Sequence, residues 1–88
     1  MVKPIKMKSI EDIERVNSIA SKYPYDIWIH GKSGIADAKS ILGMFILELD
    51  EPLFLVVSDD VDCDDLLKNL EAYLAATGKL KNDCIRNG

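Results

Sequence analysis

The sequence contains only two cysteines, Cys63 and Cys84. Two thiols this far apart cannot form a disulfide framework or supply a zinc site, and we expect both to be reduced, as is usual in the cytosol. Long hydrophobic runs are missing as well, because no uncharged apolar segment approaches the roughly 20 residues of a membrane-spanning helix. No apolar signal segment follows the first lysines. The expected location is therefore the cytoplasm, without membrane contact.

The sequence also lacks an excess of positive charge. Its net charge is −4 at pH 7, whereas a nucleic-acid interface needs clustered lysine and arginine. Nucleic acid is therefore not an expected partner. The composition, with 48% hydrophobic and 30% charged residues, is that of an ordinary globular domain. A chain of 88 residues has room for one domain, which we place at residues 1–78, with a C-terminal tail at 79–88.

Apolar periodicity predicts four strands and three helices. The strands are expected at residues 2–8, 25–30, 35–39 and 53–57, and the helices at 10–23, 41–47 and 62–77. Ser9 and Ser40 can cap the first two helices. Pro4 fits an edge strand, because its nitrogen cannot donate a hydrogen bond. The order β-α-β-β-α-β-α predicts an α+β open-faced sandwich, with a four-stranded antiparallel sheet covered on one face by helices.

The most distinctive stretch is the apolar segment after Ser40. Between Ile41 and Leu47, only Gly43 interrupts a run of large apolar side chains. A helix that is apolar on every side must be buried or must offer one side to a partner. Because the run has too many apolar positions for one buried stripe, we expect part of it to form a protein-docking surface.

The six residues Ala38-Lys39-Ser40-Ile41-Leu42-Gly43 resemble the segment around the regulatory serine of HPr, the histidine-containing phosphocarrier of the bacterial sugar phosphotransferase system. The family pattern there is close to Ala-Lys-Ser-Ile-Met-Gly. HPr has the same order of strands and helices, and the resemblance covers about residues 2–77. It implies that Ser40 is a target of HPr kinase and that four residues of the following helix bind partner proteins: Ile41, Leu42, Met44 and Phe45. The alternatives are a plain capping role for Ser40 and burial in the core for Ile41, Met44 or Phe45.

The catalytic histidine of the family has no counterpart in this sequence. HPr carries its phosphoryl group on a histidine in a loop of the form Thr-Gly-Leu-His-Ala-Arg-Pro. The corresponding residues 7–12 read Met-Lys-Ser-Ile-Glu-Asp and offer no imidazole as an acceptor. The single histidine, His30, falls beside a predicted hairpin turn and is interpreted as a turn residue. We therefore predict that the protein is not an enzyme, has no catalytic residue and needs no cofactor.

Trp28 is a candidate contact for a second copy of the chain. It alternates with Ile27 and Ile29, so it is expected on the uncovered face of the sheet. Tryptophan is enriched at interaction hot spots, which favours a homodimer contact. The alternative is that Trp28 covers neighbouring side chains on its own sheet.

The acidic residues near the last helix have the spacing of a calcium loop. Asp60, Asp62 and Asp64 alternate and Glu71 stands at the twelfth position, but Asp65 occupies the position that requires glycine. Carboxylates in the first turn of a helix also complement its dipole. We therefore interpret them as capping groups and predict no metal site.

The sequence thus predicts an HPr-like, non-catalytic regulatory or protein-interaction domain related to the phosphotransferase system, controlled by phosphorylation at Ser40. Its expected partners are proteins, such as HPr kinase or a regulator. One alternative is a phosphocarrier component of that system with an atypical acceptor. A calcium-responsive module is another.

Overall fold

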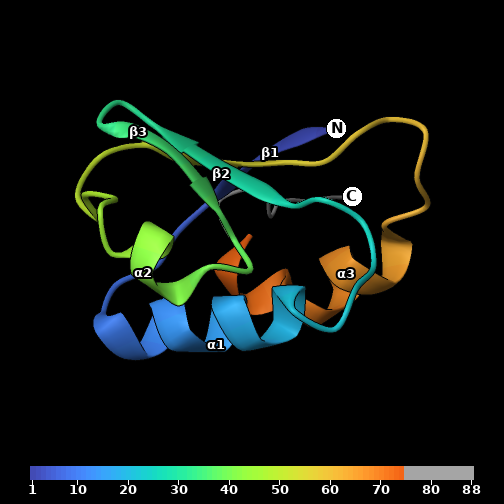
Figure 1. Ribbon diagram of the computed structural model, residues 1–88, viewed down its shortest axis with the longest axis horizontal. Coiled ribbons are helices and arrows are strands. Elements are labelled where there is room, and N and C mark those ends of the chain that lie inside the picture. The colour runs from blue at the N-terminus through green and yellow to red at the C-terminus, as the bar shows by residue number, and fades with distance from the viewer. Residues whose placement is uncertain (75–88) are drawn as a thin grey trace, which may run out of the picture.

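One antiparallel sheet and a layer of helices make up the fold of residues 1–74, the part of the chain that the computed structural model describes (Figure 1). The strands lie in the order β1-β4-β2-β3. They are β1 (Val2–Ile5), β2 (Trp28–Gly31), β3 (Gly34–Asp37) and β4 (Leu53–Val56). The helices are α1 (Ile10–Ala20), α2 (Ile41–Met44) and α3 (Asp64–Asn69), followed by the 3-10 turn η1 (Glu71–Tyr73). The predicted α+β fold with a four-stranded antiparallel sheet and three helices is confirmed.

All three helices lie on the same side of the sheet, below it in Figure 1. The alternation of side chains along each strand explains this arrangement. In β2, Ile29 is buried between Trp28 and His30, which are both more accessible. In β1, Ile5 is buried while Val2 and Pro4 are exposed. One face of each strand is therefore apolar and covered, as period-two patterning requires.

The hydrophobic core fills the space between the sheet and the helices. Its fully buried members include Ile29 and Leu55 from the sheet, Val16 from α1 and Leu66 from α3. Burying an aliphatic side chain of this size contributes about 1.5–3 kcal/mol. No polar or charged residue in the described range is buried, so the core is held by apolar packing.

Serine caps begin the first two helices, as predicted. Ser9 Oγ accepts a hydrogen bond from the backbone N–H of Asp12 at 3.3 Å, and Asp12 Oδ2 accepts one from the N–H of Lys8 at 2.8 Å. This exchange is close to a capping box, but the carboxylate reaches one residue further back than usual. The edge position of β1 agrees with the prediction from Pro4.

The observed elements are shorter than predicted. After Ala20, the amides of Lys22 and Tyr23 donate to carbonyls three residues earlier, so α1 ends in tight turns. α3 begins at Asp64 and not at residue 62, because Asp62 Oδ1 accepts from the N–H of Asp64 at 3.1 Å and holds the chain in a turn. The last helix also ends earlier than predicted, because α3 ends at Asn69 and the 3-10 turn η1 follows it, whereas a single helix was expected up to residue 77. The tail at 79–88 and Cys84 lie outside the described residues.

The longest helix in residues 1–74, α1, has only 11 residues. Within that range, no helix combines the length and the apolar character that crossing a membrane requires.

Candidate functional site

Ser40 is exposed and occupies the N-cap of α2. Its Oγ accepts a hydrogen bond from the N–H of Gly43 at 3.3 Å, and its carbonyl accepts one from Met44 at 3.0 Å. Its own amide donates to the carbonyl of Asp37 at 2.9 Å. The hydroxyl is therefore fixed at the start of the helix while it faces solvent. This confirms the predicted capping role.

The segment before Ser40 is anchored to both β3 and α1. Asp37 Oδ1 accepts from the N–H of Lys39 at 2.9 Å. Asn17, on α1, donates from Nδ2 to the carbonyl of Ala38 at 3.0 Å. These two bonds fix the position from which α2 begins, so the side chains of this helix have a defined orientation relative to the core.

Three large apolar side chains on and just after α2 are exposed: Leu42, Phe45 and Ile46. We call them the α2 surface. Leu42 is the most accessible, with 77% of its surface exposed. The spacing i, i+3, i+4 brings such residues to one side of a helical turn. The prediction that part of the apolar run is exposed is therefore confirmed.

Two of the four predicted partner-binding residues are placed differently. Met44 is 0% exposed and packs into the core, so it cannot contact a partner in this structure. Ile41 is partly buried against the core. Met44 lies two positions after Leu42, which places the two on opposite sides of a 3.6-residue turn. Ile46 was missed by sequence reasoning, although its spacing of four from Leu42 indicates the same side.

The helical segment at Ser40 ends earlier than the sequence predicts. Residues 41–47 were expected to be helical, but α2 ends at Met44. The amides of Ile46 and Leu47 then donate to carbonyls three residues earlier, at 3.3 and 3.2 Å. These tight turns carry the chain away from the helix while Phe45 and Ile46 stay at the surface.

The charges around Ser40 differ from those around the other capping serine. The first turn of α2 contains no acidic residue, whereas the first turn of α1 contains Glu11 and Asp12. Between residues 39 and 47, Lys39 is the single charged residue. A phosphate on Ser40 would have Lys39 next to it and no carboxylate in the first turn of the helix, although Asp37 accepts from the neighbouring amide of Lys39. A phosphate on Ser9 would lie beside two carboxylates.

The region that corresponds to the phosphocarrier loop of HPr is short. β1 ends at Ile5 and α1 begins at Ile10, so only residues 6–9 join them. The Asp12 side chain is engaged in capping this connection. Its position at the first turn of α1 is the one at which a phosphate would otherwise be attracted by free amides.

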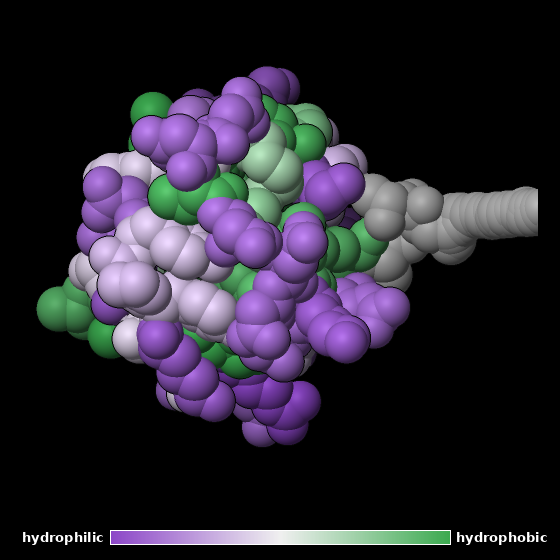
Figure 2. Space-filling model, turned by 90° about the vertical axis from the view of Figure 1, so that its right-hand side faces the viewer, coloured by the Kyte–Doolittle hydropathy of each residue, from purple (hydrophilic) through white to green (hydrophobic). Residues whose placement is uncertain are grey.

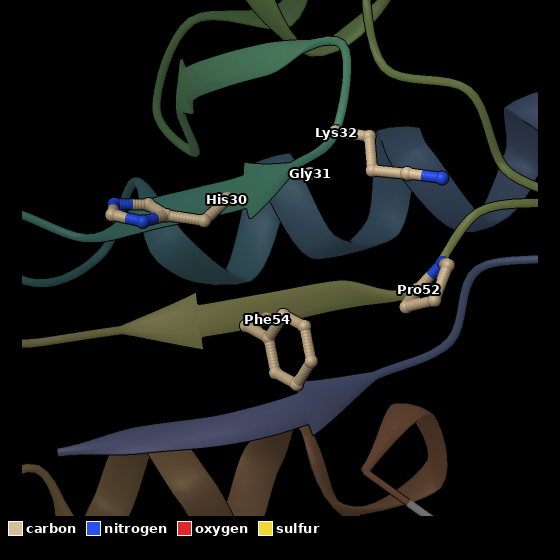
Figure 3. A pocket seen from close by; sticks show the side chains of 5 residues that line it. All are labelled: His30, Gly31, Lys32, Pro52 and Phe54. Atoms are coloured by element: carbon tan, nitrogen blue, oxygen red, sulfur yellow. The ribbon is translucent and has the colours of Figure 1, made fainter.

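His30 lies on β2 and not at a helix start. It lines an open hollow of about 470 Å³ with Gly31, Lys32, Pro52 and Phe54. Figure 3 shows that the His30 ring and the Lys32 side chain extend in opposite directions, away from each other. Trp28 is exposed on the same side of the sheet, away from the helices, as the alternation predicted.

The acidic residues before α3 make local contacts. The Ser58 hydroxyl donates to Asp60, and Asp62 accepts from the N–H of Asp64. The Cys63 thiol is buried beside them. In the part of the chain that the structure describes, no group of three or more histidine, cysteine, aspartate or glutamate side chains is arranged to hold a metal ion.

Comparison with known proteins finds no matching family model, no matching curated protein and no matching solved structure. The resemblance to HPr therefore depends on the residues around Ser40 and on the order of strands and helices.

Proposed function

We propose that this chain is a non-catalytic relative of HPr that binds a partner protein through the α2 surface, with phosphorylation of Ser40 as the switch. The observation that carries the proposal is an exposed serine hydroxyl directly before three exposed apolar side chains. The order of strands and helices, which is the order that the resemblance implied, supports it as well. So does the short connection between β1 and α1, which contains no histidine.

The α2 surface suits a partner whose own contact surface is apolar. Complete burial of Leu42, Phe45 and Ile46 would each contribute about 1.5–3 kcal/mol before the cost of association. The free-energy cost of association offsets much of the free energy gained by burying these side chains, so three side chains support a reversible complex. Such binding is appropriate for regulation.

Phosphorylation of Ser40 would weaken this binding for an electrostatic reason. A phosphoserine adds a charge of about −1.5 to −2 at neutral pH. The charge would lie two positions from Leu42, in a segment where Lys39 is the only ionised group. Covering that phosphate with an apolar partner removes it from water without compensation. The phosphorylated form is therefore the released form.

The switch is tested by incubating the protein with HPr kinase and ATP and measuring the intact mass. We expect the addition of one phosphate, which is lost in Ser40→Ala and kept in Ser9→Ala. Ser9 is the matched control, because its Oγ caps α1 at the same 3.3 Å distance from an amide. A folded protein that takes no phosphate, or takes it equally well without Ser40, contradicts the switch.

The docking surface is tested by placing a photo-crosslinking residue at position 42 and irradiating cells that express the protein. We expect a crosslinked partner whose yield falls in Ser40→Asp and is unchanged in Ser9→Asp. Both variants should fold, because aspartate caps helices as well as serine does. The same crosslinker at Val2, on the opposite side of the sheet, should not capture that partner. Equal yields from positions 2 and 42 would refute the α2 surface as the docking site.

A further inference from the structure

The face of the sheet that points away from the helices, here called the outer face, carries two rows of side chains across the four strands. The strand register aligns Val2, Val56, Trp28 and Asp37 in the first row. It aligns Pro4, Phe54, His30 and Ile35 in the second. Asp37, on the edge strand β3, is the only carboxylate in either row. The centre of the outer face is therefore nearly free of charge.

The outer face exposes much of its apolar surface. Eight large apolar side chains are exposed in the described residues, and half of them lie here: Val2, Trp28, Ile35 and Phe54. Val2 and Ile35, on the two edge strands, expose 62% and 59% of their surface. Figure 3 shows the Phe54 ring on this face, extending from β4 toward β1. A contiguous apolar area of this kind on a sheet marks an interaction site.

We propose that the outer face packs against the outer face of a second copy of this chain. Two sheets that pack face to face lie about 10 Å apart, with interdigitating side chains. A symmetric dimer uses the same patch on both subunits. The nearly uncharged centre allows this without repulsion, even though each chain carries a net charge of −4.

The charges at the two ends of the strands favour a second copy over an unrelated apolar partner. Lys6 and Lys32 are exposed at the end where β1 and β2 finish, and Asp26 and Asp60 are exposed at the end where these strands begin. Figure 2 shows this second end as mainly hydrophilic. If the two-fold axis lies parallel to the two sheets and perpendicular to their strands, the strands of the two copies run in opposite directions. This arrangement therefore brings the lysines of each copy opposite the aspartates of the other.

Two further acidic residues lie near the lysine end. Asp50 is exposed, and Glu51 is half-buried and accepts hydrogen bonds from the N–H and the hydroxyl of Ser33 at 3.3 Å. Glu51 is therefore held against the hairpin turn. The attraction between the two ends is moderate, and the apolar centre provides most of the contact.

The dimer is expected to be reversible. Strands of four residues make the outer face smaller than the roughly 800 Å² per partner of a standard interface. Sedimentation velocity on the full chain over micromolar to millimolar concentrations should therefore show a monomer–dimer equilibrium. Phe54→Lys should remain monomeric throughout this range. The matched control Leu42→Lys, an equally drastic change on the α2 surface, should dimerise like the wild type.

Two outcomes of this experiment would overturn the proposal. One is a wild-type protein that stays monomeric at all concentrations, and the other is equal loss of dimer in Phe54→Lys and Leu42→Lys. Circular dichroism establishes that each variant is folded.

The fluorescence of Trp28 gives a second readout that needs no variant, because this is the only tryptophan in the chain. At low concentration its emission should be that of a partly covered indole, because 38% of the Trp28 surface is exposed, and the emission should shift to shorter wavelength as the dimer forms. Emission that does not change over this concentration range would show that the surroundings of Trp28 are the same at every concentration. That result would refute the dimer.

The relative orientation of the two copies is tested by exchanging charges. Lys32→Glu should weaken the dimer, and Lys32→Glu combined with Asp26→Lys should restore it. This restoration is expected only if the lysine end of each copy faces the aspartate end of the other copy. If the double variant associates no better than Lys32→Glu alone, this arrangement is wrong.

Discussion

Tyr23 and Tyr25 are two positions apart, but their hydroxyl groups have different surroundings. The Tyr23 hydroxyl donates to Asp65 Oδ2 at 2.7 Å and accepts from Asn69 Nδ2 at 2.6 Å. The Tyr25 hydroxyl is buried and, among the described residues, has no hydrogen-bond partner. The two rings are in tilted contact, with centroids 5.7 Å apart. Removing the oxygen should therefore have opposite effects at the two positions.

We predict that Tyr25→Phe raises the free energy of unfolding by about 1 kcal/mol, because a buried hydroxyl without a partner is costly. Tyr23→Phe should lower the free energy of unfolding, because it removes the hydrogen bond that Tyr23 donates to Asp65 and the one that it accepts from Asn69. Urea unfolding of the two variants beside the wild type measures both effects. A Tyr25→Phe protein that is less stable than the wild type would contradict this account of the buried hydroxyl.

The titration of Tyr23 gives a second prediction. The hydrogen bond to the Asp65 carboxylate is the main cause that raises the pKa of Tyr23 above its ordinary value, while the bond from Asn69 acts in the opposite direction. Because the folded-state pKa is the higher one, this stabilisation is complete below the ordinary tyrosine pKa of about 10. It is lost as the pH rises through the folded-state value.

Absorbance titration of tyrosinate checks this pKa. Asp65→Asn should lower the pKa of Tyr23. The matched control is Asp64→Asn, because Asp64 is a neighbouring exposed carboxylate that makes no hydrogen bond to Tyr23. This control should leave the pKa of Tyr23 unchanged. Equal curves for Asp65→Asn and the wild type would mean that the hydrogen bond does not control the titration.

At the scale of elements, the hairpin between β2 and β3 depends on Gly34. This residue has φ of +151°, a conformation that side-chain-bearing residues rarely adopt. We predict that Gly34→Ala costs about 1–2 kcal/mol of stability through backbone strain. A new Cβ would meet only Ile46 Cδ1, at an ordinary 3.8 Å, so crowding is not the cause. Thermal unfolding measures the loss, and the exposed neighbour Ile35→Ala should change stability by less than about 0.5 kcal/mol.

The two sides of α2 give a further prediction. Met44→Ala should destabilise the protein by about 2–5 kcal/mol, because it leaves a cavity in the core. Leu42→Ala, on the exposed side, should stay within about 0.5 kcal/mol of the wild type. Chemical unfolding of the two variants beside the wild type measures both changes in the free energy of unfolding. Similar losses at positions 42 and 44 would contradict the placement of Met44 inside and Leu42 outside.

The sequence predicted the start of α2 but could not determine which side of it is buried. Ser40 is a specific signal, because its side chain can accept a hydrogen bond from a backbone N–H that the first turn of the helix leaves without a partner. The following run is apolar at nearly every position, so its periodicity does not distinguish an inner from an outer side. Tertiary contact with the core decides that Met44 is inside. The same reason applies to β4, whose residues are all apolar although Phe54 is exposed.

At the scale of the whole molecule, the sequence predicted the fold class but not the position of each strand. Alternating residues such as Ile27, Trp28 and Ile29 are enough to indicate strands with one covered face. The neighbours of β4 depend on how the chain crosses the sheet, and local periodicity carries no information about that. The sequence therefore indicated an uncovered face with Trp28 on it, but not which side chains of the four strands lie beside Trp28 there.

The sheet order also has a consequence for the order in which the chain folds. Trp28 and Asp37 pair across the short turn at Lys32 and Ser33, so few residues separate them along the chain. Val2 pairs with Val56, which lies much further along the chain. Closing the longer loop costs more entropy, so we expect the hairpin to form early and β1 to join last, after β4 is in place. Until then, β1 is an unpaired strand that another chain could capture. Pro4 lacks an N–H group and offers such a chain one donor fewer, which lowers the risk of capture while β1 is unpaired.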